Sequence, residues 1–165
     1  MKTLSLWQPW ATLIAIGAKR IETRSWYTPY RGPLAIHAAK THNQDMIDAM
    51  MLEPFRYALK SAGLKCEMRA VGGYHADQIP LGCVVATCDL VECIKVETHT
   101  MFPNSLNSRI PPNEPERSFG DYTPGRYAWF LENIQPVNPF PFKGRQQLFE
   151  VPDELITQEQ ITGVR

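Results

Sequence analysis

The chain has 165 residues, of which 44% are hydrophobic and 21% are charged, as in soluble globular proteins. Its 17 Lys and Arg balance 17 Asp and Glu, which excludes a uniformly basic protein that coats nucleic acid. No apolar run reaches the ~18–20 residues of a membrane span, and the N-terminus lacks the apolar stretch of a signal peptide. We expect one cytoplasmic domain over residues 1–165, without a membrane partner.

The four cysteines predict no metal site. Their positions form no CxxC pair, the four histidines are scattered, and three of the cysteines lie in an apolar segment. Reduced thiols in such a segment pack as small hydrophobic groups. We therefore expect a reducing compartment, no metal and no cofactor.

Positive charge and aromatic rings are concentrated at the start of the chain. Residues 1–40 carry six Lys or Arg, one acid and three of the four tryptophans, whereas residues 41–142 carry a net charge of −4 and residues 143–165 of −1. Rings beside fixed cations can stack on bases and meet phosphates, so this region favours a local anionic ligand. An ordinary solvated face is the alternative.

The first elements are a strand over 3–6, a helix over 9–16 that Gly17 ends, and a strand over 21–26. Pro9 suits the first turn of that helix. Strand alternation places Glu22, Arg24 and Trp26 on one face, with Ile21, Thr23 and Ser25 on the other. A carboxylate, a guanidinium and an indole on one face are typical of a pocket wall.

The middle of the chain predicts a turn over 28–33, a strand over 34–39 and a helix over 44–62 that Pro54 kinks or divides. Residues 63–81 are expected to be irregular. The β-branched run over 82–96 then predicts a buried strand.

The last third begins with a polar, proline-rich stretch over 97–124 that could form a lid. A strand over 127–134, a stiff proline segment to 141 and a closing strand over 142–151 follow. The tail after Pro152 is expected to be a short turn or frayed. Short strands with few helices indicate an α+β fold: a small closed β-barrel of five or six strands with flanking helices.

Several motifs together resemble the activating signal cointegrator homology (ASCH) domain family. They are the GxKxxExR run from Gly17 to Arg24, the flanking SLWQPWA and GPLAIH segments, GRYAW at 125–129 and KGRQ at 143–146. The resemblance implies a PUA-like barrel on which 41–81 and 97–124 are insertions. It also implies binding of RNA or another nucleic acid in a cleft that the GxKxxExR segment lines.

Other branches of that superfamily are enzymes. One hydrolyses an acetylated cytidine nucleoside, and another is associated with ribonuclease activity. The deacetylating branch has a threonine nucleophile three residues after the lysine, where this chain has Glu22. Thr23 is adjacent but faces the opposite way on the strand. This departure favours binding over catalysis.

The leading hypothesis is a cleft that binds RNA, another single-stranded nucleic acid or a nucleoside-like small ligand. Its predicted binding residues are Trp7, Gln8, Trp10, Lys19, Arg24, Trp26, Tyr30 and Arg31. Several of them have a purely structural alternative to ligand binding. These alternatives are a solvated Lys19, a barrel-lining Glu22–Arg24 ion pair, a tryptophan in the core, and a Gln8 that caps the helix.

Two further hypotheses come from other classes of protein. The enzymatic one is a nucleoside amidohydrolase or ribonuclease that uses Lys19, Glu22 and Asp89, with Asp89 paired to Lys19 or Arg24 across the barrel. The third is an interaction module that binds a protein partner through the 97–124 loop.

Overall fold

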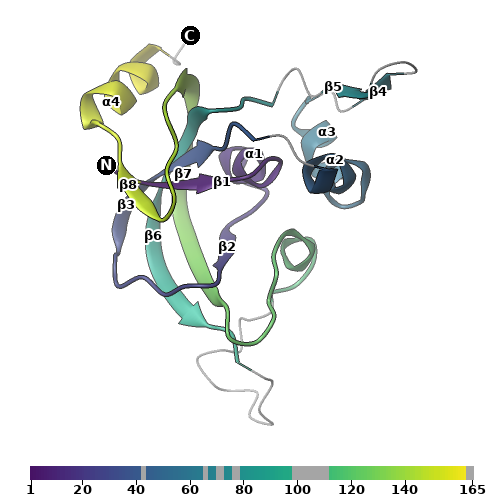
Figure 1. Cartoon of the computed structure of the whole chain (residues 1–165), viewed down its shortest axis with the longest axis horizontal. Helices are drawn as coiled ribbons and strands as arrows, with labels where there is room; N and C mark the ends of the chain where they lie inside the picture. Colours follow the sequence, from purple (N-terminus) through teal and green to yellow (C-terminus); the bar gives the residue numbers. More distant parts are fainter. Residues whose placement is uncertain (42–43, 65–66, 70–72, 76–78, 98–111, 163–165) are drawn as a thin grey trace.

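The computed structural model describes residues 1–41, 44–64, 67–69, 73–75, 79–97 and 112–162. Its centre is a six-stranded sheet with the strand order β2-β7-β6-β3-β1-β8. The strands are β1 (Lys2–Leu6), β2 (Ile21–Arg24), β3 (Gly32–Ala38), β6 (Cys83–Lys95), β7 (Tyr127–Pro141) and β8 (Leu148–Glu150). β1 and β3 run parallel, and the other neighbours in this sheet are antiparallel. The sheet is strongly curved (Figure 1).

The sheet curls without closing, so the predicted closed barrel is wrong in this respect. β2 and β8 end the strand order, and no ladder joins them in the part of the chain that the structure describes. Both strands are short, with 4 and 3 residues. The result is an open half-barrel with flanking helices, which agrees with the predicted α+β class and with the expected number of strands.

The helix α1 (Trp10–Ala15) packs between two apolar clusters. Its Ala11 and Ile14 lie in the core of the curved sheet, whereas Leu13 belongs to the cluster formed by the next helices. Gly17 follows the helix with φ +75°, in the left-handed region that glycine favours. The amides of Ala18 and Lys19 both return to the Leu13 carbonyl, and this turn leads the chain into β2.

The predicted division of the second helix at Pro54 is confirmed. The structure has α2 (Gln44–Met51) and α3 (Phe55–Ser61), which lie together on one side of the molecule (Figure 1). Residues 63–81 were expected to be irregular, but their described part contains a hairpin of β4 (Glu67–Arg69) and β5 (Gly73–His75). That expectation is wrong for these six residues because the hairpin strands are too short to show a periodic pattern.

β7 is twice as long as predicted and passes through the prolines at 136, 139 and 141. Its first part pairs with β2 on one side and β6 on the other, but the ladder with β2 reaches only as far along β7 as Phe130, opposite Ile21. Beyond that point β7 pairs with β6 alone. A proline has no N–H to donate, and a strand that is paired on one side tolerates this loss.

The C-terminal part also differs from its prediction. β8 occupies three residues of the expected 142–151 strand, and the preceding residues form a turn that reaches the cleft described below. The helix α4 (Asp153–Thr162) then packs Ile156 against Val137 and Phe140 of β7. No helix among the described residues is long and apolar enough to cross a membrane.

Half of the predicted lid over 97–124 falls on residues 98–111, which lie outside the described residues. Its described remainder includes the 3₁₀ helix η1 (Glu116–Phe119). This helix contacts the turn between α1 and β2, because Glu116 accepts hydrogen bonds from the backbone amides of Arg20 (2.7 Å) and Ile21 (3.1 Å). Insertion of 41–81 and 97–124 into a smaller scaffold stays a prediction.

Candidate nucleic-acid interface

A cleft of about 720 Å³ takes its lining from the edge strand β2 and from the turn that precedes the other edge strand, β8. β2 supplies one side, the turn before β8 supplies another, and the rest comes from the β1–α1 corner and the chain around η1. The lining residues are Ser5, Leu6, Trp7, Trp10, Glu22, Thr23, Arg24, Ser25, Ala39, Ser118, Phe119, Gly120, Asp121, Arg126, Arg145, Gln146 and Gln147. Incomplete closure of the barrel therefore leaves room for a ligand.

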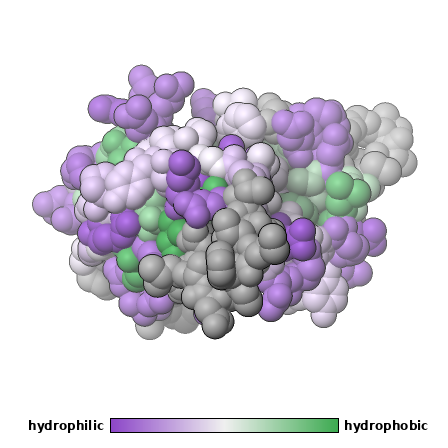
Figure 2. All heavy atoms as spheres, turned by 90° about the horizontal axis from the view of Figure 1, so that it is seen from below, coloured by the Kyte–Doolittle hydropathy of each residue, from purple (hydrophilic) through white to green (hydrophobic). Residues whose placement is uncertain are grey.

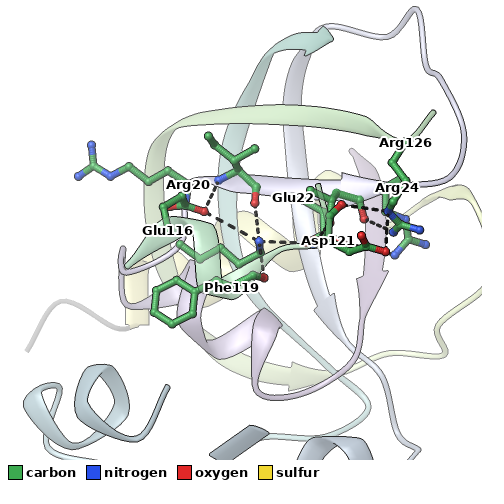
Figure 3. Close-up of polar contacts among 10 residues, drawn as sticks. Arg20, Glu22, Arg24, Glu116, Phe119, Asp121 and Arg126 are labelled. Atoms are coloured by element: carbon green, nitrogen blue, oxygen red, sulfur yellow. Dashed lines mark hydrogen bonds and ion pairs between the residues drawn. The ribbon is translucent and has the colours of Figure 1, made fainter. Parts of the chain in front are cut away.

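Lys19 lies beneath this cleft and has no exposed surface. Its ammonium donates hydrogen bonds to the Ile21 carbonyl and, at 3.0 Å, to the Phe119 carbonyl. Two carboxylates lie further out, Glu22 at 3.7 Å and Glu116 at 3.9 Å. Figure 3 labels Glu22, Glu116 and Phe119, and its dashed lines converge between them. Lys19 is thus not a solvated surface lysine, which was the structural alternative, and its enclosed ammonium cannot touch a ligand directly.

Burial sets the electrostatics of this cluster. It lowers the pKa of the Lys19 ammonium, while the carboxylates of Glu22 and Glu116 oppose the shift. Burial also raises the pKa of the Glu116 carboxyl group, against the opposing effects of Lys19 and two backbone amides. A buried charge is tolerated where partners surround it. Lys19 therefore joins α1, β2 and η1 into one wall.

Two arginines lie at the outer end of that wall (Figure 3). Arg24 Nη1 is 3.5 Å from Glu22 Oε1, so the expected pairing of these two residues is present. Arg126 donates hydrogen bonds to the carbonyls of Thr23 and Asp121, each at 3.1 Å. Arg145 reaches the same cleft from the turn before β8. Three guanidinium groups thus line one cavity, two of them paired with carboxylates, Arg24 with Glu22 and Arg126 with Asp121. A guanidinium group suits forked hydrogen bonds to a phosphate.

The predicted aromatic residues separate into two groups. Trp7 is 52% exposed at the cleft, and Trp10 lines it while packing edge-on against Phe55 at 5.7 Å. Trp26 instead packs edge-on against the fully buried Trp129, with ring centroids 4.7 Å apart. Strand alternation predicted that Trp26 shares a pocket wall with Arg24. Because Trp26 lies just beyond the end of β2, that alternation does not extend to it. It lies outside the cleft lining.

Tyr30 and Arg31 also lie outside the cleft lining. The Tyr30 hydroxyl donates to the Pro33 carbonyl at 2.5 Å, and its ring packs on the sheet core. The Arg31 guanidinium donates to the carbonyls of Thr28 (2.9 Å) and Tyr30 (2.5 Å). Both side chains stabilise the connection between β2 and β3.

Gln8 has a structural position, as the capping alternative anticipated. It is fully buried, its Oε1 accepts a hydrogen bond from the Thr12 amide at 3.0 Å, and its Nε2 donates to the Pro80 carbonyl at 2.8 Å. Both ends of the amide are therefore engaged. It has no free edge for a base.

Asp89 makes neither of the predicted ion pairs, since Lys19 and Arg24 are paired with Glu22 and Glu116 instead. It sits on β6 opposite Pro33 and Glu132, and it accepts a hydrogen bond from Asn133 at 2.7 Å. The expected pairing with Lys19 or Arg24 is wrong. Asp89 interrupts an apolar sequence run because its side chain is only half-buried at that point of the strand.

Most of the cleft residues that lie beyond position 40 were not predicted from the sequence. Arg126 and Arg145 belong to two of the motifs that resemble the ASCH family, GRYAW and KGRQ. The sequence therefore contained a signal for both arginines. Glu116 and Asp121 stand in the polar 97–124 stretch, which has no periodicity that could single them out. Within the described residues no group of three His, Cys, Asp or Glu side chains is placed to hold a metal ion.

The comparisons with known proteins agree with this architecture. The family model for the ASCH domain matches residues 4–141. The human protein named "Activating signal cointegrator 1" is 28% identical over 155 residues, and its mouse counterpart is 27% identical over 154. Each match covers 92% of this chain and 22% of the relative, so the chain spans about a fifth of their length.

A solved structure supports the fold. The crystal structure of ASCH from Zymomonas mobilis superposes with a TM-score of 0.51 and 18% identity, and it covers 98% of this chain and 93% of that chain. At this identity the likeness concerns the fold alone. It is consistent with the half-barrel described above.

Proposed function

The chain belongs to the ASCH domain family, and from this premise and the geometry of its cleft we propose that it binds RNA or another single-stranded nucleic acid. The family is commonly associated with RNA binding. The observation that carries the proposal is the convergence of Arg24, Arg126 and Arg145 with the rings of Trp7 and Trp10 on one cleft. Guanidinium groups suit phosphates, and exposed rings suit bases.

The shape and chemistry of the cleft favour a strand over a small apolar ligand. It is open to solvent and lined by polar as well as apolar groups, including the amides of Gln146 and Gln147. Those amides lie beside the arginines and can donate to or accept from a base edge. A single-stranded segment presents both phosphates and unstacked bases, whereas a duplex hides its base faces.

The enzymatic alternative through Lys19 has a weaker basis in this geometry. The ammonium is fully enclosed, and its hydrogen bonds go to two backbone carbonyls. A catalytic lysine must reach the substrate, directly or through one water. We assign Lys19 a positioning role: it holds Glu22, and through it Arg24, at the cleft.

The salt dependence of binding tests the proposal. We expect Arg145→Ala to weaken the affinity for a fluorescent single-stranded RNA and to reduce the slope of log K against log salt by about 0.7 per lost phosphate contact. Arg145 is exposed, so the fold should tolerate its removal. The readout is fluorescence anisotropy at several salt concentrations, with Arg56→Ala on the exposed side of α3 as the matched loss of one charge. Equal affinities and slopes for both variants and the wild type would reject the proposal.

A further inference from the structure

A hydrogen-bonded serine and histidine lie at the cleft and have no part in the proposed binding of nucleic acid. Ser5 and His37 are partners in the parallel ladder of β1 and β3, and Ser5 Oγ is 2.8 Å from His37 Nδ1. His37 Nε2 is 2.9 Å from the Phe142 carbonyl oxygen. A carbonyl only accepts, so Nε2 carries the proton. Nδ1 is then free of a proton and accepts the hydrogen bond of the Ser5 hydroxyl.

Of the two residues, Ser5 and not His37 borders the cleft. Ser5 is half-buried and lines the cavity, whereas His37 is 1% exposed. Burial lowers the pKa of the His37 imidazole, which keeps it neutral at physiological pH. A neutral imidazole with its lone pair on a hydroxyl proton is the form that a general base requires.

The turn that follows β7 covers the pair closely. A Cβ atom added at Gly144 would lie 2.5 Å from His37 Cε1 and 2.8 Å from Ser5 Oγ, so only glycine fits there. The next residues of the turn, Arg145 and Gln146, line the same cleft. Arg145 and Gln146, which can donate hydrogen bonds to a developing negative charge, therefore come directly after Gly144 in the chain.

We propose that Ser5 and His37 form a nucleophile–base pair that hydrolyses a carboxylic ester of a phosphate-bearing alcohol. A nucleophile, a base within hydrogen-bond reach and a third group that orients the base are the three parts that such catalysis requires. Here the third group is the Phe142 carbonyl. The phosphate of the substrate would meet the guanidinium groups at the cleft.

The chemical steps use water as the sole co-reactant. Ser5 Oγ forms a bond to the acyl carbon while its proton passes to His37 Nδ1. The ester C–O bond then breaks, and the leaving alkoxide takes that proton and departs as the alcohol. Water attacks the acyl-serine with the same base, which releases the carboxylic acid and restores the Ser5 hydroxyl.

Covalent labelling of the full chain with a fluorophosphonate, followed by peptide mapping, tests the proposal. We expect labelling at Ser5, a fall of at least tenfold in its rate in His37→Gln, and hydrolysis of p-nitrophenyl acetate that falls in parallel. Ser118 is the internal comparison, because it lies at the same cleft but its hydroxyl donates to Glu114 at 2.6 Å, and it should take no label. Ser61→Ala at the exposed end of α3 is the matched control, and its labelling at Ser5 should equal that of the wild type.

A second variant keeps His37 and so makes the test independent of how well His37→Gln folds. In Ser5→Cys the new thiol should react with iodoacetamide faster than the half-buried thiol of Cys83, as peptide mapping would show. No label at Ser5, a labelling rate that His37→Gln leaves unchanged, or equal labelling of Ser118 would overturn the proposal. Because RNA affinity is not measured here, these outcomes are separate from the test of nucleic-acid binding.

Discussion

Trp7 and Trp26 illustrate how two tryptophans of the same segment take different roles. The ring of Trp7 is 52% exposed at the cleft, whereas that of Trp26 packs on Trp129 in the core. Arg24 Cζ lies 6.0 Å from the centroid of the Trp26 ring, so Trp26 contributes to the cleft only by supporting a residue that lines it. Affinity should therefore depend on one ring and stability on the other.

Substitution of these two rings separates binding from folding. Trp7→Ala should cost about 1–3 kcal/mol of RNA binding free energy, the usual contribution of one base stacked on an aromatic ring, with little change in unfolding free energy. Trp26→Ala should lower the free energy of unfolding by about 1–3 kcal/mol through lost packing. Anisotropy and urea denaturation measure the two effects. The reverse assignment of losses would show that Trp7 is not the base-stacking ring.

His37 predicts how stability responds to acid. Its pKa lies below the usual 6.5 because burial disfavours the imidazolium, so the unfolded chain binds the proton more readily. Stability from this residue is full above pH 6.5 and is lost as the pH falls through that value. Urea denaturation between about pH 7 and pH 5 should show this loss in the wild type and a smaller one in His37→Gln. Parallel profiles for the two proteins would contradict it.

The charged and aromatic character of the site could be predicted from the sequence. The burial and the hydrogen-bond partners of each side chain could not. Gln8 and Lys19 were both predicted to bind the ligand, yet both are fully buried and bonded to backbone groups. One of the two carbonyl acceptors of Lys19 belongs to Phe119, and the acceptor of the Gln8 amide nitrogen belongs to Pro80, both far along the chain. No local pattern predicts such long-range contacts.

At the scale of elements, η1 is held to the barrel by polar contacts around Lys19. The Glu116 carboxylate accepts two backbone amides, and the Phe119 carbonyl accepts the Lys19 ammonium. The Phe119 ring also packs against Phe55 at 5.0 Å, which joins η1 to the helical side of the molecule. This helix therefore fixes one wall of the cleft.

Glu116→Gln tests this attachment. The substitution changes one carboxylate oxygen to an amide nitrogen and removes the negative charge. One backbone amide and the buried Lys19 ammonium then lose a charged partner. We expect the free energy of unfolding to fall by about 1–3 kcal/mol in urea denaturation. Glu132→Gln on the exposed face of β7 is the matched control and should change it by less than about 0.5 kcal/mol. Equal stability of the two variants would mean that Glu116 does not secure η1.

Element prediction succeeded where the signal was local. Pro54 divides a helical segment, and Gly17 ends α1 with a positive φ, as their residue types indicated. The prediction failed for β7, whose prolines at 136, 139 and 141 read as a stiff connector. Whether a strand has one neighbour or two depends on tertiary pairing, and that decides whether proline is tolerated.

At the scale of the whole molecule, the open edge of the sheet and the distribution of charge act together. The number and class of strands were predictable, but closure was not, because it depends on whether β2 and β8 meet. The face shown in Figure 2 is mainly hydrophilic, with small separate hydrophobic areas among the described residues. A molecule without net charge thus places three of its arginines, Arg24, Arg126 and Arg145, at one opening.

The location of a bound strand tests the central claim most directly. Single-stranded RNA that contains 4-thiouridine should cross-link, under long-wavelength light, to peptides that contain Trp7 and Trp10 and to the turn at 145–147. Mass spectrometry of the digested complex identifies these peptides, and an excess of unlabelled RNA should abolish the signal. Cross-links concentrated on α2 and α3 or on residues 27–31, or signals that competitor RNA leaves unchanged, would contradict the account.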